Sequence, residues 1–293
     1  MGCNRHGPPD GRGVTDLSAH RCGGSGLSRR GRPTRLSGLI DSHCHLQHGR
    51  FDADRDAVLE RAVEAGIERI MVPGWDLASS EAALALAARH APLVQAAVGV
   101  HPHYAAETDE RSWSLLEALI ADPRCAAVGE IGLDFYRNLS APEVQHVAFE
   151  RQLEAAANRD LPVLVHDRDA HAEVTAALTS WTGRAGHRAR GVLHAFSGDA
   201  GMAEMLVAHG FLVSFALPVT FRSATGPRAA ATAIGAEEYV IETDAPYLGP
   251  DRDRRNEPTT TLRVATELAR LRGIEPQMVA DGARRAYERL IGV

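Results

Sequence analysis

The chain has 293 residues, of which 44% are hydrophobic and 24% charged, and its formal net charge is −6. This length and apolar content are enough for one large core, and α/β barrels commonly occupy such a length as a single domain. No run approaches the roughly 18 consecutive apolar residues of a membrane helix and the four cysteines form no C-x-x-C pair, so we expect a cytoplasmic protein with reduced thiols and no structural zinc site.

The first 38 residues differ in composition from the rest of the chain. Seven Arg and two Asp give them a formal charge of +5, so the remaining residues carry −11 within the total of −6. Nine glycines and few apolar residues cannot bury enough surface to fold, which predicts a disordered extension at 1–38 and a single domain at 39–293. No apolar segment follows the Arg pair at 29–30, so we expect no export signal. A basic arm that touches nucleic acid is a possible role for this segment, but a solvated leader is the favoured interpretation.

From residue 39 onward, short β-branched runs alternate with longer segments of helical spacing. The predicted strands are 39–40, 68–72, 94–100, 125–131, 161–165, 191–193, 211–215 and 239–242. The predicted helices are 55–65, 78–89, 112–121, 142–158, 169–180, 201–209, 227–234, 259–272 and 276–291. Eight strands that alternate with helices are typical of a (β/α)8 TIM barrel in the α/β class, with a doubly wound open sheet as the competing arrangement.

Histidines and carboxylates recur at the carboxyl ends of these predicted strands. His43 and His45 follow the first strand and project to the same side, because side chains alternate along an extended chain, although this pair alone is a weak metal signal. Later strand ends present further candidates, namely His101, His103, Glu130, His166, His194 and Asp244. Any one of these histidines taken singly is better explained as a structural hydrogen-bonding group. Because strand ends share one face of a barrel, their joint recurrence predicts a metal centre there.

Six segments, in this order, resemble the motifs of the TatD family of metal-dependent hydrolases. They are Asp-Ser-His-Cys-His-Leu at 41–46, Gly-Val-His-Pro-His at 99–103, Glu-Ile-Gly-Leu-Asp-Phe-Tyr at 130–136, His-Asp-Arg-Asp-Ala at 166–170, His-Ala-Phe-Ser-Gly at 194–198 and Glu-Thr-Asp-Ala-Pro-Tyr-Leu at 242–248. The resemblance runs from about residue 39 to the C-terminus. It implies an amidohydrolase-like barrel, a divalent metal centre and deoxyribonuclease activity, with 3′ to 5′ exonucleolytic trimming in some members.

The resemblance also implies the ligands of two divalent ions per subunit. These would be His43, His45 and Asp244 for one ion and His166 and His194 for the other, with Glu130 as the bridge. A carboxylated lysine bridges the metals of many barrel hydrolases in the wider superfamily, but all 32 basic residues of this chain are Arg. Imidazole and carboxylate ligands together admit zinc, manganese or magnesium.

The expected chemistry is hydrolysis of a phosphodiester, because two ions that share a water lower its pKa and stabilise the attacking and leaving oxygens. Asp244 is expected to accept the proton of the water, while His101 contacts a phosphate oxygen or protonates the leaving group. Further substrate contacts are expected from His103, Arg168, Tyr136 and Arg255. Loop packing explains the pair His101 and His103 equally well, and solvation explains Arg168 and Arg255 equally well.

The acidic barrel favours trimming of single-stranded DNA or strand ends over wrapping of a duplex, which needs many cationic contacts. It equally permits a small substrate, so a metal-dependent hydrolase of a small amide, ester or aminoacyl bond is the alternative function. A non-catalytic binding protein on the same barrel is a third reading. No obligate protein partner is evident.

Two segments depart from the family pattern, the turn at 214–218 and the pair at 286–287 in the last helix.

Overall fold

The computed structural model of the protein describes residues 36–251 and 254–292. Most of the extension predicted at 1–38 therefore lies outside the described residues. Within its last three positions, Leu36 is already buried and the backbone N–H of Ser37 donates to the Gln277 side chain. The packed part of the chain thus includes residues that precede the predicted boundary.

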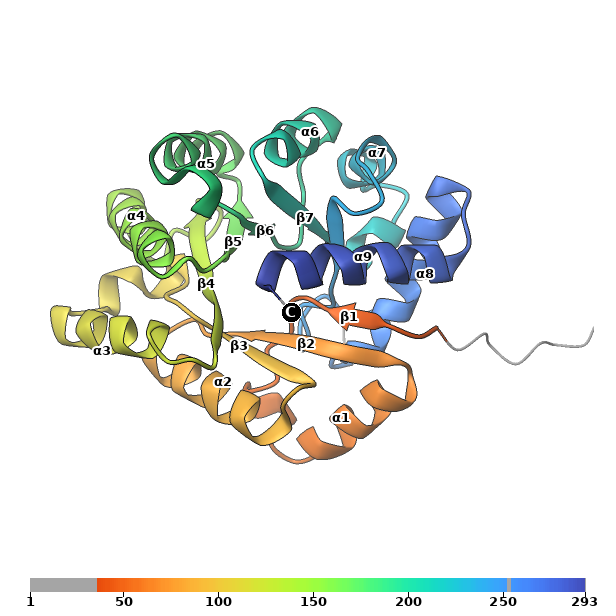
Figure 1. The fold of residues 1–293 in the computed structure, drawn as a ribbon, viewed down its shortest axis with the longest axis horizontal. Helices are drawn as coiled ribbons and strands as arrows, with labels where there is room; N and C mark the ends of the chain where they lie inside the picture. The colour runs from red at the N-terminus through yellow and green to blue at the C-terminus, as the bar shows by residue number, and fades with distance from the viewer. Residues whose placement is uncertain (1–35, 252–253, 293) are drawn as a thin grey trace, which may run out of the picture. The chain divides into compact units, whose positions relative to one another are not determined.

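Eight parallel strands form the sheet, and neighbours in the sheet follow their order in the chain (Figure 1). They are β1 Leu39–Asp41, β2 Ile67–Pro73, β3 Val94–Val98, β4 Cys125–Asp134, β5 Val163–Arg168, β6 Gly191–Leu193, β7 Phe211–Phe215 and β8 Tyr239–Ile241. The chain after β1 meets the chain at β8 through backbone hydrogen bonds from Ser42 to Ile241, 3.0 Å, and from His45 to Ala245, 2.7 Å. The (β/α)8 barrel prediction is confirmed, and the open doubly wound sheet is wrong.

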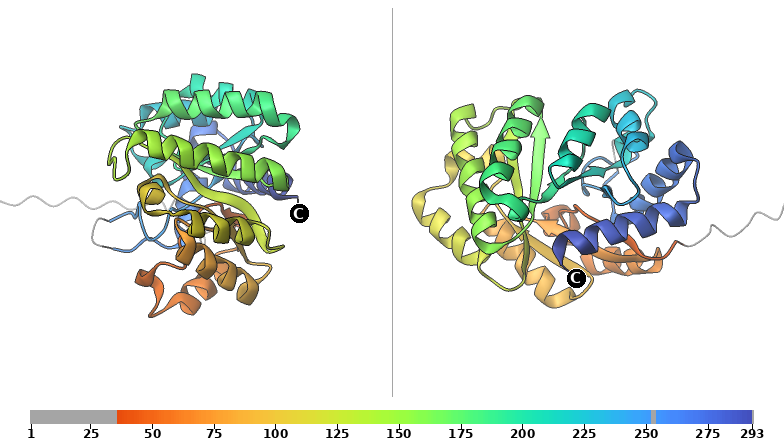
Figure 2. Two further views of the ribbon diagram at one scale, coloured as in Figure 1. Left: turned by 90° about the vertical axis from the view of Figure 1, so that its left-hand side faces the viewer. Right: turned by 45° about the horizontal axis from the view of Figure 1, so that its top comes forward.

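Helices α1 to α8 lie around the outside of this sheet, and α9 lies across one end of the barrel (Figures 1 and 2). They are α1 Arg55–Glu64, α2 Leu77–His90, α3 Glu110–Ile120, α4 Pro142–Arg159, α5 His171–Ala185, α6 Ala200–Ala208, α7 Thr225–Ala233, α8 Thr261–Arg272 and α9 Pro276–Ile291. Short 3-10 turns occur at η1 Gly49–Phe51, η2 Pro102–Glu107, η3 Gly186–Arg188, η4 Leu217–Thr220 and η5 Pro258–Thr260. None of the described helices combines the length and apolarity that a bilayer crossing requires.

Local side-chain chemistry explains where several helices begin and end. The α3 helix starts before the predicted residue 112 because Asp109 caps it, with its carboxylate accepting from the Ser112 N–H at 2.8 Å. The α5 helix starts later than predicted, at His171, because Asp169 adopts a left-handed φ of 55°. It also runs past the predicted end at residue 180, where Trp181 is buried in the core.

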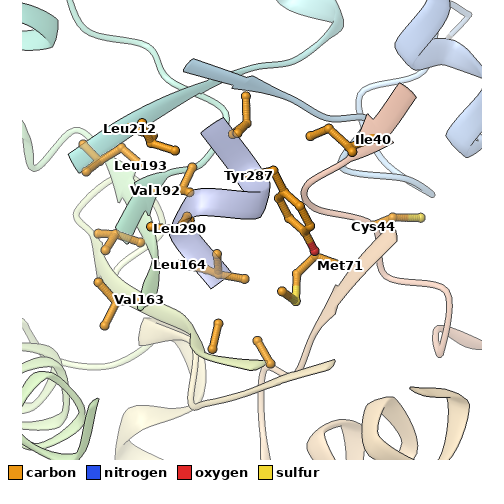
Figure 3. Packing of buried hydrophobic residues seen from close by; sticks show 14 of the residues in the cluster. Ile40, Cys44, Met71, Val163, Leu164, Val192, Leu193, Leu212, Tyr287 and Leu290 are labelled. Carbon is orange, nitrogen blue, oxygen red and sulfur yellow. The ribbon is translucent and has the colours of Figure 1, made fainter. Parts of the chain in front are cut away.

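The last helix, α9, lies across the barrel against β1 and β8 (Figure 1), at the amino-terminal ends of the strands. Tyr287 is buried there, and its hydroxyl donates to Oε1 of Gln95 near the start of β3 at 2.6 Å. Leu290 points toward the same core, which includes Met71 and Leu164 (Figure 3). The departure from the family pattern at 286–287 therefore lies at the end of the barrel opposite the predicted ligands.

Candidate metal centre

The side chains predicted as metal ligands lie together at the carboxyl-terminal ends of the strands. His43 and His45 follow β1, Glu130 lies in β4, His166 lies in β5, His194 follows β6 and Asp244 follows β8. Short distances between their ligand atoms divide these residues into two groups that share Glu130. The first ligand group is His43, His45, Asp244 and Glu130. The second ligand group is His166, His194 and Glu130.

The first ligand group contains two imidazole nitrogens and two carboxylate oxygens. Nε2 of His43 lies 3.3 Å from Nε2 of His45 and 3.3 Å from Oε2 of Glu130. Nε2 of His45 lies 3.5 Å from the same Glu130 oxygen and 3.4 Å from Oδ1 of Asp244. That Asp244 oxygen is 3.8 Å from Nε2 of His43, so four ligand atoms surround one small volume.

The second ligand group uses the other oxygen of the same glutamate. Oε1 of Glu130 lies 3.0 Å from Nδ1 of His166 and 3.0 Å from Nε2 of His194. The two imidazole nitrogens are 3.3 Å apart. His101 adds its Nε2 at 3.6 Å from the same oxygen. Glu130 therefore faces two adjoining groups of histidines, one with each carboxylate oxygen.

These spacings fit divalent cations. An ion that binds four tetrahedral ligands at 2.0–2.1 Å separates them from one another by about 3.3–3.4 Å, which is close to the values in both groups. The imidazole nitrogens of His43 and His45 face each other at 3.3 Å, as do those of His166 and His194, so in each pair at most one nitrogen can carry a proton toward the other. A cation could take the place of that proton. The clustered histidines and carboxylates can thus bind metal.

Two carboxylates fix the orientation of the histidines in the second group. Oδ2 of Asp134 lies 3.1 Å from Nε2 of His166, and Oε1 of Glu242 lies 3.3 Å from Nδ1 of His194. Each contact favours a proton on that nitrogen, so the opposite nitrogen, which faces Glu130, is the one that a cation would bind. Both carboxylates lie within the quoted motifs, but sequence reasoning assigned them no role. The even spacing of Asp134 from Glu130 along one strand was the available signal.

Asp41 ties the first group to the neighbouring strand end. Its carboxylate accepts from the backbone N–H of Thr243 at 2.9 Å and from the Thr243 hydroxyl at 2.6 Å. Thr243 immediately precedes Asp244, and Asp41 precedes His43 by two residues. These bonds therefore hold a ligand from the β8 side against the two histidines from the β1 side. Sequence reasoning also missed this role of Asp41.

The electrostatics of the site favour an ionised bridge. Burial opposes ionisation of Glu130, but the surrounding histidines, His194 foremost, hold the pKa of its carboxyl well below the ordinary value. Burial likewise opposes protonation of His194, yet Glu130 and Glu242 raise its pKa well above the ordinary value. Since a cation that binds His194 must displace this proton, metal affinity is expected to rise with pH.

The position of Glu130 depends on an irregularity in β4. The strand runs to Asp134 and not to the predicted residue 131, so Glu130 lies inside the strand, where the pairing with β5 shifts register between Val128 and Ile131. Gly132 has φ of +135°, and a Cβ on it would collide with the carbonyl oxygen of His166. The β5 strand also extends further than predicted, so His166 lies within it.

The predicted substrate contacts lie in different surroundings. His103 places Nε2 at 2.9 Å from Oδ2 of Asp134, beside the second ligand group. The Arg168 guanidinium lies over the ring of Tyr136 at 4.0 Å, and Tyr136 is 61% exposed. These three residues follow or end the strands β3, β4 and β5 at the mouth of the barrel.

Arg255 is engaged with protein groups. Its guanidinium donates to both carboxylate oxygens of Asp54, at 2.6 and 2.8 Å, and to Glu257 at 3.0 Å. It also lies over the ring of Phe51 at 4.4 Å. This network joins the segment after β8 to the segment after β1, and a phosphate at Arg255 would have to compete with two carboxylates.

Comparisons with known proteins identify the family that this chain resembles. A family described as TatD related DNase matches residues 40–292. The chain is 32% identical to an uncharacterized metal-dependent hydrolase, YabD of Bacillus subtilis, over 87% of this chain and 99% of that protein. It is 37% identical to a 3′-5′ ssDNA/RNA exonuclease TatD of Erwinia billingiae, over 82% of this chain and 93% of that protein. The crystal structure of YjjV, a TatD homologue from Escherichia coli, superposes with a TM-score of 0.81 at 30% identity, over 87% of this chain and 98% of that one.

Proposed function

The chain belongs to the TatD-related DNase family of metal-dependent hydrolases, and on this basis we propose that it is a 3′-5′ exonuclease that hydrolyses the phosphodiester bonds of single-stranded DNA. The observation that carries the proposal is the arrangement around Glu130, whose two oxygens face separate groups of histidines. Two adjoining cation sites suit phosphodiester hydrolysis, because both the attacking and the leaving oxygen need stabilisation.

We assign the ligands as two sets with one shared member. The first set is His43, His45 and Asp244, the second is His166 and His194, and Glu130 belongs to both, as the distances between their ligand atoms favour. Bound divalent ions supply Lewis acidity toward a phosphate oxygen and lower the pKa of a water. Zinc, manganese and magnesium are the candidates for this mixed set of imidazoles and carboxylates.

Two residues of the site are proposed to act on protons. The Asp244 side chain is 14% exposed, and contacts with histidines, His45 foremost, lower the pKa of its carboxyl against the effect of burial. An ionised Asp244 carboxylate that is partly open to solvent can accept the proton of the attacking water. Nδ1 of His101 accepts from the N–H of His103 at 3.1 Å, so the proton lies on Nε2. That N–H can donate to a phosphate oxygen.

The rim of the barrel supports a nucleic-acid substrate. Tyr136 offers an exposed ring on which a base can stack, and the Arg168 guanidinium beside it can receive a phosphate. The barrel segment is acidic overall, so broad electrostatic binding of a duplex is disfavoured. A strand end that needs a few contacts is the substrate these features favour.

The test uses protein stripped with a chelator and reloaded separately with zinc, manganese or magnesium. A single strand labelled at its 5′ end should yield a ladder of successively shorter labelled products. Asp244→Asn and His166→Ala should each lower kcat by about 100-fold or more. If the loaded protein leaves DNA intact and instead hydrolyses small amides, esters or aminoacyl compounds, the nuclease proposal is wrong and the alternative substrate class replaces it.

A further inference from the structure

A group of rings beside the first ligand group has no part in metal binding. Trp75 follows β2 and Tyr247 follows β8, and their ring centroids lie 5.4 and 6.0 Å from the ring of His45. Both rings stand nearly perpendicular to His45, at 73° and 74°. His48 lies near both, at 6.0 Å from Trp75 and 5.8 Å from Tyr247. We call Trp75, His48 and Tyr247 the aromatic cluster.

Backbone hydrogen bonds tie the cluster to the metal centre. The N–H of Tyr247 donates to the carbonyl of Asp244 at 2.8 Å. The carbonyl of Trp75 accepts from the N–H of His101 at 3.0 Å, and the N–H of Trp75 donates to the Ser79 hydroxyl at the start of α2 at 2.8 Å. The backbone segments that carry the Trp75 and Tyr247 rings are therefore tied to the segments that carry Asp244 and His101.

The surroundings of the cluster identify the chemistry of a ligand. Tyr247 is 47% exposed, although its ring lies next to the buried His45. Part of this large ring therefore faces solvent at the mouth of the barrel. Nη1 of Arg50 donates to the carbonyl of Pro246 at 3.2 Å. Since Pro246 immediately precedes Tyr247, this bond places the Arg50 guanidinium near Tyr247. An exposed ring with a neighbouring guanidinium suits a planar base that is attached to a phosphate.

We propose that the aromatic cluster stacks on the base of the terminal nucleotide while its phosphodiester lies at the metal centre. This inference rests on the proposed nuclease function and adds a specificity determinant to it. In a duplex the base is paired and stacked on its neighbours, so its faces are not available to Tyr247 and Trp75. The cluster therefore selects an unpaired strand end.

The test compares two single strands that differ only at the 3′ terminus, one ending in a thymidine and the other in an abasic nucleotide. Stacking should make kcat/KM about 10-fold or more higher for the strand with the terminal base. Tyr247→Ala should reduce this preference to near one, whereas Tyr247→Phe should retain it because the ring remains. Phe221→Ala is the matched control, because Phe221 is a similarly exposed ring, at 51%, after β7. It should keep the preference.

Dissociation constants of the same two strands, measured in the Asp244→Asn background by fluorescence anisotropy, separate the two proposals. If no metal-loaded form cleaves either strand, the nuclease function fails, but a Kd that is about 10-fold lower for the base-ended strand still supports the stacking site. Equal Kd values for the two strands overturn the stacking site, as does a preference unchanged by Tyr247→Ala. Circular dichroism verifies folding, and Trp75→Ala replaces Tyr247→Ala if that variant does not fold.

Discussion

At the scale of single residues, the second ligand group depends on carboxylates that are not assigned as ligands. Asp134→Asn replaces an acceptor of the His166 N–H with an amide, which no longer fixes the ring with Nδ1 toward Glu130. We expect metal affinity to fall by about 10- to 100-fold. Titration of the stripped protein with zinc measures it. The exposed carboxylate of Glu143 provides the control as Glu143→Gln, and equal affinities for the two variants would refute this role of Asp134.

Gly132 offers a second test at this scale. An alanine there would adopt a φ of +135° and collide with the backbone of His166, so we expect a loss of about 3 kcal/mol or more in the free energy of unfolding. Gly183 is the matched control, because it lies in α5 and has no atom within 4 Å of an added Cβ. Gly183→Ala should stabilise the protein by about 0.5–1 kcal/mol. Urea denaturation measures both, and a loss below 1 kcal/mol in Gly132→Ala would contradict the clash.

At the scale of elements, hydrophobic periodicity located each of the eight strands and nine described helices, and for some of them it also gave the bounds. The structure confirms the predicted bounds of β6, β7 and α9. Prediction failed at β4 and β5, because their pairing continues past the apolar runs, from Gly132 opposite His166 to Asp134 opposite Arg168. Polar side chains at those positions give no strand signal. The ends of β4 and β5, which carry functional side chains, are recognised only from the pairing of the two strands in the structure.

The same limit applies to the site. Histidines could be identified because they recur after apolar runs, whereas a carboxylate such as Asp41 or Glu242 looks like any other polar residue at a strand end. The function of such a carboxylate depends on the imidazole nitrogen or backbone N–H that it contacts on another strand. That pairing joins residues far apart in the sequence, such as Glu242 and His194, and no local pattern encodes it.

The junction between α7 and α8 gives a prediction that depends on pH. Glu267 accepts from Arg270 at 2.7 Å and from Arg228 at 2.6 Å, and the hydrogen bonds of Arg270 first and then Arg228 lower its pKa to about 2. Arg228 also donates to the carbonyl of Val219, so the pair links α8 to the segment after β7. Glu267→Gln should cost about 1 kcal/mol at pH 7.

The sign of the pH dependence follows from the direction of this pKa shift. A carboxyl whose pKa is lower in the folded state than in the unfolded state stabilises the protein above the unfolded value, near 4.5. The stabilisation disappears as the pH falls toward about 2. The difference between wild type and Glu267→Gln in urea denaturation should therefore shrink over this interval. Glu204→Gln, an exposed change on α6, should show no such trend, and a pH-independent difference for Glu267→Gln would contradict the ion pair.

At the scale of the whole molecule, the two ends of the barrel differ in the kinds of side chain that they carry. The carboxyl-terminal ends of the strands carry the buried histidines and carboxylates, while α9 closes the other end with apolar side chains and Tyr287. In barrels of this type, residues at the amino-terminal end contribute to stability and residues at the carboxyl-terminal end to activity. The substitution pattern at 286–287 therefore bears on the packing of α9 and leaves the ligand set untouched.

This separation predicts that metal binding and α9 packing stabilise the protein independently. Tyr287→Phe removes the hydrogen bond to Gln95 and should cost about 1 kcal/mol, which lowers Tm by roughly 2–4 °C. Removal of the ions with a chelator should cost about 4 kcal/mol relative to protein at 1,000 times the metal Kd. Because the two sites share no partners, the two losses should add within about 0.5 kcal/mol. Asp244→Asn should reduce the effect of the chelator and leave the effect of Tyr287→Phe unchanged. If the chelator destabilises the Tyr287→Phe variant much more or much less than wild type, the ends of the barrel are coupled.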